Sequence, residues 1–401
     1  MKFLLLSLFI LFHIGSYAQS NKIETFPGEE KINYSSNIIT GAQNINEYIP
    51  LLKGKRVAIL SNQSGLINDN THIVDTLAAL GVNITCIMSP EHGFRGAADA
   101  GEHVSNSIDE KTGIPIISLY GVKNDDNSMA SKFDVMVFDI QDVGVRFYTY
   151  YVTMTKMMDL CAKYDKEFIV LDRPNPIGFL TDGPILDMKY KSGVGYLPIP
   201  IAHGMTLGEL ANMINGEGWL SNGSKCKLTI IKCKNYTHDM LYRLPIKPSP
   251  NLPDMRSIYL YPSTCYFEAT PVSLGRGTDK PFQMYGHPNM KGYCYSFTPK
   301  STPGAKNPPL KDKKCYGVDL RKKPSIEEIN KNGINLSYII DAYNNLNLGD
   351  HFFRSFFELE IGRDYVRKMI KEGKNSDEIR ALWREDVEKF KAQRKPYMLY
   401  K

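Results

Sequence analysis

Glu91 and His92 are the first candidates for catalysis, because they directly follow an apolar run of the kind that forms a buried strand. They belong to the sequence SPEHG at residues 89–93, after the apolar run at 82–88. A glutamic acid that neighbouring loops shield from water has a raised pKa and can act as a general acid. The histidine beside it can relay a proton or contact a substrate. Ordinary roles stay open: Glu91 can pair with Arg95 or cap a turn, and His92 can pack inside and bond the backbone.

Asp139 and Asp142 form a second pair of candidates, in the sequence DIQD that follows the apolar run at 134–138. Two carboxylates this close together suit acid–base catalysis, metal binding or the recognition of sugar hydroxyls. A structural ion pair between Asp142 and Arg146 is the alternative. Because hard cations usually need more oxygen ligands than this pair offers, we expect no metal site.

Further polar loops offer groups that could bind a ligand. Two prolines stiffen the sequence DRPNP at 172–176 and fix where its side chains point. Arg276 lies between two glycines, so the backbone there can approach a ligand and the guanidinium can grip a carboxylate. Glu268 is a further carboxyl group, and glycoside hydrolysis commonly uses two. His203 precedes a predicted helix. Each of these residues could equally belong to an ordinary turn or helix start.

The pattern of apolar runs predicts how these loops come together. Strands are expected at 56–60, 82–88, 114–119, 134–138, 167–171 and 226–233. Because helical patterns separate several of them, we expect an α/β fold: a Rossmann-like, mainly parallel sheet with helices on both faces. Ligands bind such sheets outside the carboxyl ends of the strands. Four of the strands end in dense polar clusters, which predicts a site at that edge.

The chain is expected to divide into four parts. A basic start, an apolar run and small residues before Gln19 predict a signal peptide at 1–18. It is followed by a polar, loosely attached leader at 19–45. After the leader we expect a Rossmann-like catalytic domain at 46–280 and a smaller α+β C-terminal auxiliary domain at 281–401. The apolar run is too short to span a bilayer, so we expect an exported, periplasmic or secreted protein without a transmembrane segment.

Local signals refine the second half of the chain. Capping boxes predict helix starts at Thr206 and Ser325, and residues 299–314 are typical of an exposed linker or long loop. One face of a terminal helix is predicted from Ile379, Leu382, Trp383, Val387 and Phe390.

Composition and missing motifs exclude several classes of protein. The formal charge of +6 falls to +5 without Lys2, and no basic run is interleaved with aromatic residues, so we expect no nucleic-acid partner. Nucleotide-binding glycine motifs, the G-x-S-x-G elbow and the H-E-x-x-H helix are all absent from the sequence. The seven cysteines show no zinc spacing, and their odd number leaves at least one thiol unpaired in a monomer.

Six ordered motifs together resemble the exo-β-N-acetylmuramidase family (NamZ-like, glycoside hydrolase family 171). They are SNQSG at 61–65, SPEHGFRG at 89–96, DIQDVGVRFYTY at 139–150, LDRPNP at 171–176, PIAHGMT at 200–206 and SLGRGTD at 273–279. The similarity extends from about residue 45 to the end of the chain.

The resemblance implies release of N-acetylmuramic acid from the non-reducing ends of peptidoglycan fragments such as MurNAc-GlcNAc, with no metal or organic cofactor. It places the catalytic glutamate at Glu91, which we expect His92, Asp139 and Asp142 to assist. The lactyl carboxylate of the substrate would need a cation. The residues expected to bind the saccharide are Asn62, Arg95, Arg146, Tyr148, Asp172, Arg173, Asn175, His203, Glu268, Arg276 and Asp279.

Two other functions stay open. A non-catalytic peptidoglycan-binding protein could have kept the same cleft. An amidase or esterase acting on the cell wall would need a nucleophile paired with a histidine, and the sequence offers no recognisable arrangement of that kind. The sequence does not predict an oligomeric state.

Overall fold

The computed structural model of the chain describes residues 21–90, 93–94, 106–119 and 126–401. The predicted signal peptide at 1–18 and three predicted site residues, Glu91, His92 and Arg95, therefore lie outside the described residues. Within the described part of the chain, no helix is both long and apolar enough to cross a bilayer.

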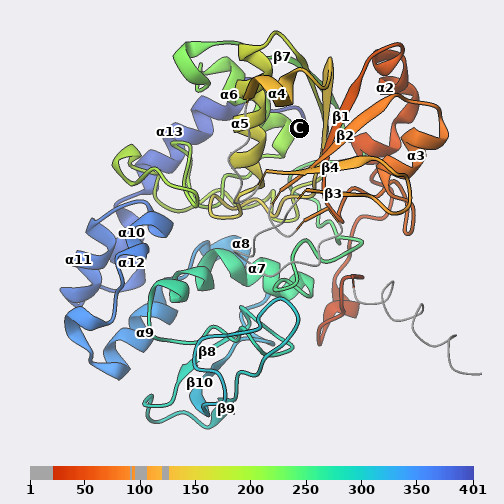
Figure 1. The fold of residues 1–401 in the computed structure, drawn as a ribbon. Helices are drawn as coiled ribbons and strands as arrows, with labels where there is room; N and C mark the ends of the chain where they lie inside the picture. The colour runs from red at the N-terminus through yellow and green to blue at the C-terminus, as the bar shows by residue number, and fades with distance from the viewer. Residues whose placement is uncertain (1–20, 91–92, 95–105, 120–125) are drawn as a thin grey trace, which may run out of the picture.

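A seven-stranded sheet forms the centre of the first part of the protein (Figure 1). Its strands lie in the order β3 (Ser107–Ile108), β4 (Pro115–Ser118), β2 (Ile84–Ser89), β1 (Val57–Ser61), β5 (Val135–Asp139), β6 (Glu167–Leu171) and β7 (Lys227–Ile231). All neighbours pair in parallel except β3, which runs antiparallel to β4. This confirms the predicted α/β fold with a mainly parallel sheet.

Helices cover both faces of the sheet, which explains why its central strands are apolar along their whole length. In β1, Val57 and Ile59 enter one apolar cluster, and Ala58 and Leu60 enter another. One face carries α2 (Ile45–Leu52) and α3 (Ile73–Ala79), and the other carries α4 (Asp126–Ala130), α5 (Tyr150–Lys163) and α6 (Leu207–Gly216). The predicted capping box at the start of α6 is confirmed.

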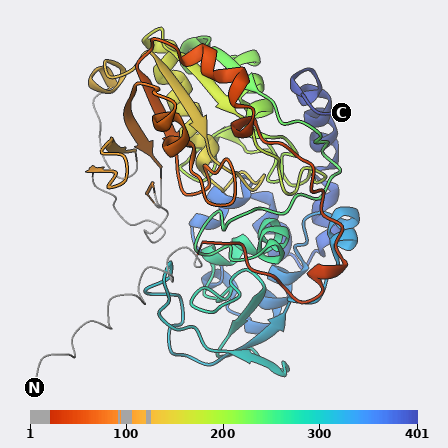
Figure 2. The ribbon, with the colours of Figure 1, turned by 90° about the vertical axis from the view of Figure 1, so that its right-hand side faces the viewer.

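A second, smaller part combines an antiparallel sheet with short helices, as expected for an α+β domain. Its three strands lie in the order β8 (Met284–His287), β10 (Cys315–Asp319) and β9 (Tyr295–Phe297). Its helices are α7 (Met255–Thr264), α8 (Ile326–Asn332), α9 (Ser337–Leu346), α10 (Phe356–Ile361), α11 (Tyr365–Lys371), α12 (Ser376–Ala381) and α13 (Arg384–Arg394). The two sheets lie toward opposite ends of the molecule, with α7 between them (Figures 1 and 2).

The segment before β1 packs against the protein, which differs from the loosely attached leader that we expected. Ile23 and Phe26 are buried in the main apolar cluster. The Glu24 amide donates to Pro253 O at 2.8 Å, and Glu29 forms an ion pair with Arg243. The segment is held by such single contacts with distant residues, so it has no periodicity that the sequence could reveal.

Residues 299–314 form a loop between two strands of the same three-stranded sheet, so they do not link two domains. They connect β9 to β10, which are paired neighbours. Asn251 Nδ2 donates to Gly304 O at 2.8 Å and anchors the loop. The expected long loop is therefore present, while the expected linker is not.

The predicted terminal helix is broken into α12 and α13. Leu382 and Trp383 lie between them, with backbone bonds to Ile379 and Arg380, three residues earlier, as in a tight turn. Leu382 is 53% exposed, whereas Trp383 is buried and donates from Nε1 to Asp182 at 2.7 Å. The turn therefore removes Leu382 from the predicted apolar face.

Candidate active site at the carboxyl edge of the sheet

The carboxyl ends of β1, β2, β5 and β6 lie along one edge of the seven-stranded sheet. Ser61 at the end of β1 is in register with Asp139 at the end of β5. Ser89 at the end of β2 is in register with Ser118 of β4. Parallel pairing therefore places these strand ends side by side, at the edge where such folds bind ligands.

A hydrogen-bond network joins the loop after β1 to the loop after β5. Ser61 Oγ donates to Asp139 O at 2.7 Å, and the Gln141 amide donates to Ser64 Oγ at 2.8 Å. Ser64 Oγ in turn donates to Asn62 Oδ1 at 2.5 Å. Asn62 Nδ2 and Gln141 Oε1 are buried and have no hydrogen-bond partner among the described residues. Such groups usually bind something, so they are candidates for contact with a ligand or another loop.

Asp139 and Arg173 form a buried ion pair between the ends of β5 and β6. Arg173 Nε donates to Asp139 Oδ1 at 2.6 Å, and Nη2 donates to Oδ2 at 3.0 Å. Nη2 also donates to Leu66 O at 2.9 Å. The Asp139 charge raises the pKa of Arg173 against the lowering effect of burial. The two charges neutralise each other. Because the hydrogen bonds of Arg173 also reach Asp139 and Leu66, the pair holds the loops after β1, β5 and β6 in place.

Only one of the two carboxyl oxygens of Asp142 has a hydrogen-bond partner among the described residues. Its Oδ1 accepts from the Gly144 amide at 2.6 Å, whereas its buried Oδ2 has no hydrogen-bond partner in the described part of the chain. Burial raises the pKa of Asp142 to about 7, although the amides of Gly144 and Val143 oppose the shift. A carboxyl group that titrates near neutrality can donate or accept a proton, as acid–base catalysis requires.

Gly144 allows the backbone to turn so that the Gly144 amide reaches the carboxylate of Asp142. Its φ of 78° lies in the left-handed region, where glycine is strongly favoured. A Cβ atom on Gly144 would lie 2.3 Å from Asn175 Oδ1. Asn175 itself donates from Nδ2 to Met205 O at 2.9 Å and accepts from the Ile177 amide. Asn175 therefore fastens the rigid loop after β6 to its neighbours.

Asp172 anchors the start of α6. Its carboxylate accepts from Thr206 Oγ1 at 2.6 Å, from the Gly208 amide at 2.8 Å and from Tyr400 OH at 2.6 Å. Burial raises the pKa of Asp172 to about 6, although these donors oppose the shift. The chain end thus closes over the first part of the protein.

His203 and Arg146 are both fully enclosed. Burial lowers the pKa of His203 to about 3, so it is neutral; its Nδ1 accepts from the Met205 amide. Arg146 makes no ion pair with Asp142, which settles the alternative left open above. Its guanidinium donates instead to the carbonyl oxygens of Pro184, Ile199, Glu360 and Ile361 at 2.7–3.0 Å. It has no exposed surface with which to bind a substrate.

The described loops enclose little space of their own. A cavity of about 10 Å³ lies between Asp142, Asp172, Asn175 and Met205. It has room for about one water molecule and none for a sugar ring. These loops therefore form a packed support at the sheet edge.

Glu268 and Arg276 lie together in the second part of the protein. Arg276 Nη2 and Nε donate to Glu268 Oε1 at 2.6 and 3.0 Å, and the guanidinium lies 5.1 Å from the centre of the Phe282 ring. Ring contacts of 4.7 Å from Phe282 to Tyr261 and 6.3 Å from Tyr261 to Tyr148 connect this pair to the loop after β5. Tyr148 OH donates to Pro248 O at 2.7 Å.

The last predicted site residue, Asp279, lies on the surface. It is exposed, and it lies close enough to Arg321 and Tyr295 for its charge to add to the rise in their pKa values, which is due first to the Asp319 hydrogen bond for Arg321 and to burial for Tyr295. It is therefore associated with the three-stranded sheet.

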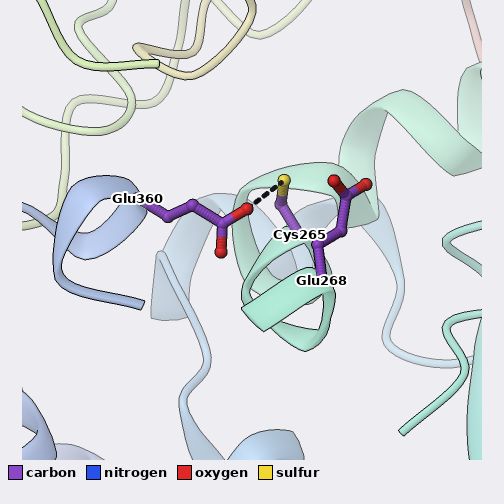
Figure 3. A group of neighbouring side chains, drawn as sticks. All are labelled: Cys265, Glu268 and Glu360. Carbon is purple, nitrogen blue, oxygen red and sulfur yellow. Dashed lines mark hydrogen bonds between the residues drawn. The ribbon is translucent and has the colours of Figure 1, made fainter. Parts of the chain in front are cut away.

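Glu360 and Cys265 are neighbours of Glu268 that the sequence did not single out. Figure 3 shows Cys265 between the two glutamates, with its thiol donating to Glu360 Oε1 at 3.8 Å. The ligand atoms of all three lie within 4.8 Å of one another. Burial and the nearby Glu268 charge raise the pKa of Glu360 well above its usual range. Because Arg276 already supplies a positive charge beside Glu268, the group is balanced as it stands.

Ser64 and Gln141 were also missed as members of the site. Both lie inside motifs quoted for the family resemblance, but neither side chain carries a charge that would distinguish it from the other polar residues of those motifs. Glu360 had no signal at all, because α10 lies far along the chain from every motif.

Comparison with known proteins identifies the family. The models "Exo-beta-N-acetylmuramidase NamZ, N-terminal" and "Exo-beta-N-acetylmuramidase NamZ, C-terminal" match residues 57–256 and 259–400. "Peptidoglycan beta-N-acetylmuramidase NamZ" of Bacillus subtilis (strain 168) is 38% identical over 376 residues, which are 88% of this chain and 89% of that protein.

Solved structures agree with this assignment. Crystal structures of two DUF1343 family proteins from Bacteroides fragilis NCTC 9343 match with TM-scores of 0.85 and 0.76, at 61% and 31% identity. Each match covers 91% of this chain and 99% of the other chain. The chain belongs to the NamZ family of exo-β-N-acetylmuramidases.

Proposed function

We propose that this protein is a glycosidase that releases N-acetylmuramic acid from the non-reducing ends of peptidoglycan fragments such as MurNAc-GlcNAc. The observation that carries the proposal is the family match, which spans both parts of the chain almost without a gap. The relative from Bacillus subtilis, named as a peptidoglycan β-N-acetylmuramidase, matches over nearly its whole length.

The proposed general acid is Glu91. In the sequence it comes two positions after Ser89, the last residue of β2. The acid would protonate the leaving oxygen while the glycosidic bond breaks, and water would supply the new oxygen at the anomeric carbon. Asp142 is the second group that we propose, because its carboxyl has a pKa of about 7 and one oxygen without a partner among the described residues.

Arg276 is the arginine best suited to the lactyl carboxylate. Arg146 is committed to four carbonyl oxygens, and Arg173 is committed to Asp139. Arg276 donates from Nε and Nη2 to Glu268, while no described residue accepts from its Nη1, and its side chain is 20% exposed.

We also propose that the protein acts outside the cytoplasm, because residues 1–18 have the basic start, apolar run and small residues of a signal peptide. Mass spectrometry of the exported protein should show that the chain begins at Gln19. An exported protein that retained Met1 would contradict this proposal.

Incubation of the full-length mature protein with MurNAc-GlcNAc tests the activity. Release of both monosaccharides is expected, and the anomer formed first would distinguish retention from inversion. Tight binding of the disaccharide without any release would instead favour a non-catalytic binding protein.

A further inference from the structure

The positive charge of the protein is concentrated in one segment. Residues 291–323, here called the basic segment, contain nine lysines and arginines but only two aspartates, a formal charge of +7. The whole chain carries +6, so all its other residues together carry −1. A field of one sign at one place on a protein attracts partners of the opposite sign.

The basic segment forms two strands of the three-stranded sheet and the loop between them. Lys311, Lys313 and Lys314 lie just before β10, and Lys322 lies just after it. All four side chains are exposed, and none makes an ion pair with another described residue. Both aspartates of the segment are already paired, Asp312 with Lys300 and Asp319 with Arg321. No described carboxylate therefore forms an ion pair with any of the four lysines.

The sheet holds these lysines apart. β10 is the central strand, with β8 on one side and β9 on the other. Five residues of extended strand span roughly 16 Å, so lysines lie at two places about that far apart. A small anion could occupy only one of them. An extended polymer with repeated negative charges could contact both at once.

The residues at both ends of β10 are fixed by burial and by hydrogen bonds. Cys315 is buried at the start of β10, and Leu320 is buried just after its end. Arg256 of α7 donates to Leu320 O at 2.6 and 3.0 Å. At the start of β10, Lys311, Lys313 and Lys314 follow closely on one another, and because their like charges repel, an anionic partner would stabilise this end of the arrangement.

We propose that the basic segment binds the polymeric form of the substrate, glycan strands whose peptide stems carry free carboxylates. This inference rests on the proposed function, because it assigns the charged surface to the polymer on which the enzyme acts. The segment belongs to the smaller sheet, at the far end of the molecule from the seven-stranded sheet (Figures 1 and 2). A second point of attachment raises the local concentration of chain ends near the catalytic edge.

Sedimentation with insoluble peptidoglycan tests the proposal. The variant Lys311→Gln, Lys313→Gln, Lys314→Gln, Lys322→Gln is compared with the control Lys22→Gln, Lys53→Gln, Lys132→Gln, Lys232→Gln. All eight lysines are exposed, and each variant lowers the formal charge by four. We expect the first variant to bind about tenfold more weakly at low salt, the control to bind like the unmodified protein, and added salt to remove the difference.

The outcomes separate this inference from the proposed function. Hydrolysis of MurNAc-GlcNAc should be unchanged in both variants; if the unmodified protein fails to cleave it, the proposed function is wrong, whatever the sedimentation shows. Unchanged sedimentation of the first variant, or an equal loss in both variants, would overturn the inference. The inference would also be overturned if the first variant lost binding to phosphatidylglycerol vesicles but bound peptidoglycan as well as the unmodified protein does.

Discussion

Three aspartates at the carboxyl edge of the seven-stranded sheet differ in what their oxygens bind. Asp139 faces the guanidinium of Arg173, and Asp172 accepts from two hydroxyl groups and two backbone amides. Asp142 has one oxygen bound by an amide and one without a partner among the described residues. Asp139 and Asp172 therefore hold neighbouring groups in place, whereas Asp142 keeps one oxygen available, which is why we propose it for proton transfer.

Glu91→Gln is expected to remove hydrolysis and leave the fold intact. Glutamine has nearly the same shape but cannot donate the proton to the leaving oxygen, so the rate should fall by about 10²–10⁴-fold. Monosaccharide release from MurNAc-GlcNAc measures the loss, and thermal unfolding checks the fold. Glu110→Gln, at an exposed glutamate, is the matched control and should keep full activity. Undiminished turnover of Glu91→Gln would rule out this residue as the acid.

Asp142 should make the stability depend on pH. Because its pKa in the folded protein, about 7, exceeds its ordinary value of 3.8, the folded state binds the proton more tightly than the unfolded state. The free energy of unfolding should then decrease as the pH rises from about 4 to about 7, by about 4 kcal/mol at most. Asp172, with a raised pKa of about 6, acts in the same direction.

Urea unfolding between pH 4 and pH 8 measures this effect. Asp142→Asn should flatten the dependence, while Asp69→Asn, at an exposed carboxylate, should leave it unchanged. If the slope is the same in Asp142→Asn and in the unmodified protein, Asp142 does not titrate as described.

The residue types at the site were more predictable than their partners. The DIQD motif pointed to Asp142 because a carboxyl group after an apolar strand suggests acid–base chemistry, and the same reasoning points to Glu91, which lies outside the described residues. The role of Arg146 could not be predicted, because its partners are carbonyl oxygens as far away as residue 361. Every residue has such an oxygen, so the sequence offers nothing to distinguish those that Arg146 binds.

At the scale of elements, long apolar runs were the reliable signal. The run at 167–171 is β6 residue for residue, and the predicted capping boxes start α6 and α8. The two-residue strand β3 was missed, because so short and exposed a strand is held by its pairing with β4 and not by apolar periodicity. The break between α12 and α13 was missed because Leu382 continues the apolar spacing although it is exposed.

The ion pair between Asp139 and Arg173 joins the ends of β5 and β6, so its loss should affect both strands. Asp139→Asn leaves a buried guanidinium without its counter-ion, which typically costs about 3–5 kcal/mol. In the double variant Asp139→Asn, Arg173→Met, the charge is gone as well, so part of the stability should return. Urea unfolding of the single and double variants measures the coupling. A double variant that is as unstable as the sum of the two single variants would contradict a direct interaction.

At the scale of the whole molecule, the two parts are held together by polar contacts, several of them buried, as well as by the apolar cluster. The chain end returns to the first part, where Tyr400 OH donates to Asp172 and Tyr397 OH donates to Glu217. Arg146 connects the loop after β5 to the end of α10. Because the site proposed here uses Asp142 from one part and Arg276 from the other, these contacts also set the distance between its two halves.

Substitution of Arg146 should therefore lower the free energy of unfolding of the whole protein. Its two Nη atoms donate to Pro184 and Ile199 on one side and to Glu360 and Ile361 on the other. Arg146→Met would leave four carbonyl oxygens without this donor, and we expect a loss of several kcal/mol, since each buried group left unsatisfied costs about 1–3 kcal/mol. Arg146→Lys should recover little, because a single ammonium cannot reproduce the planar, forked donor geometry. Urea unfolding measures the stability, and limited proteolysis shows whether cleavage appears around residues 184–199. Full stability of Arg146→Lys would mean that positive charge alone, and not the fork of donors, holds α10 to the loop after β5.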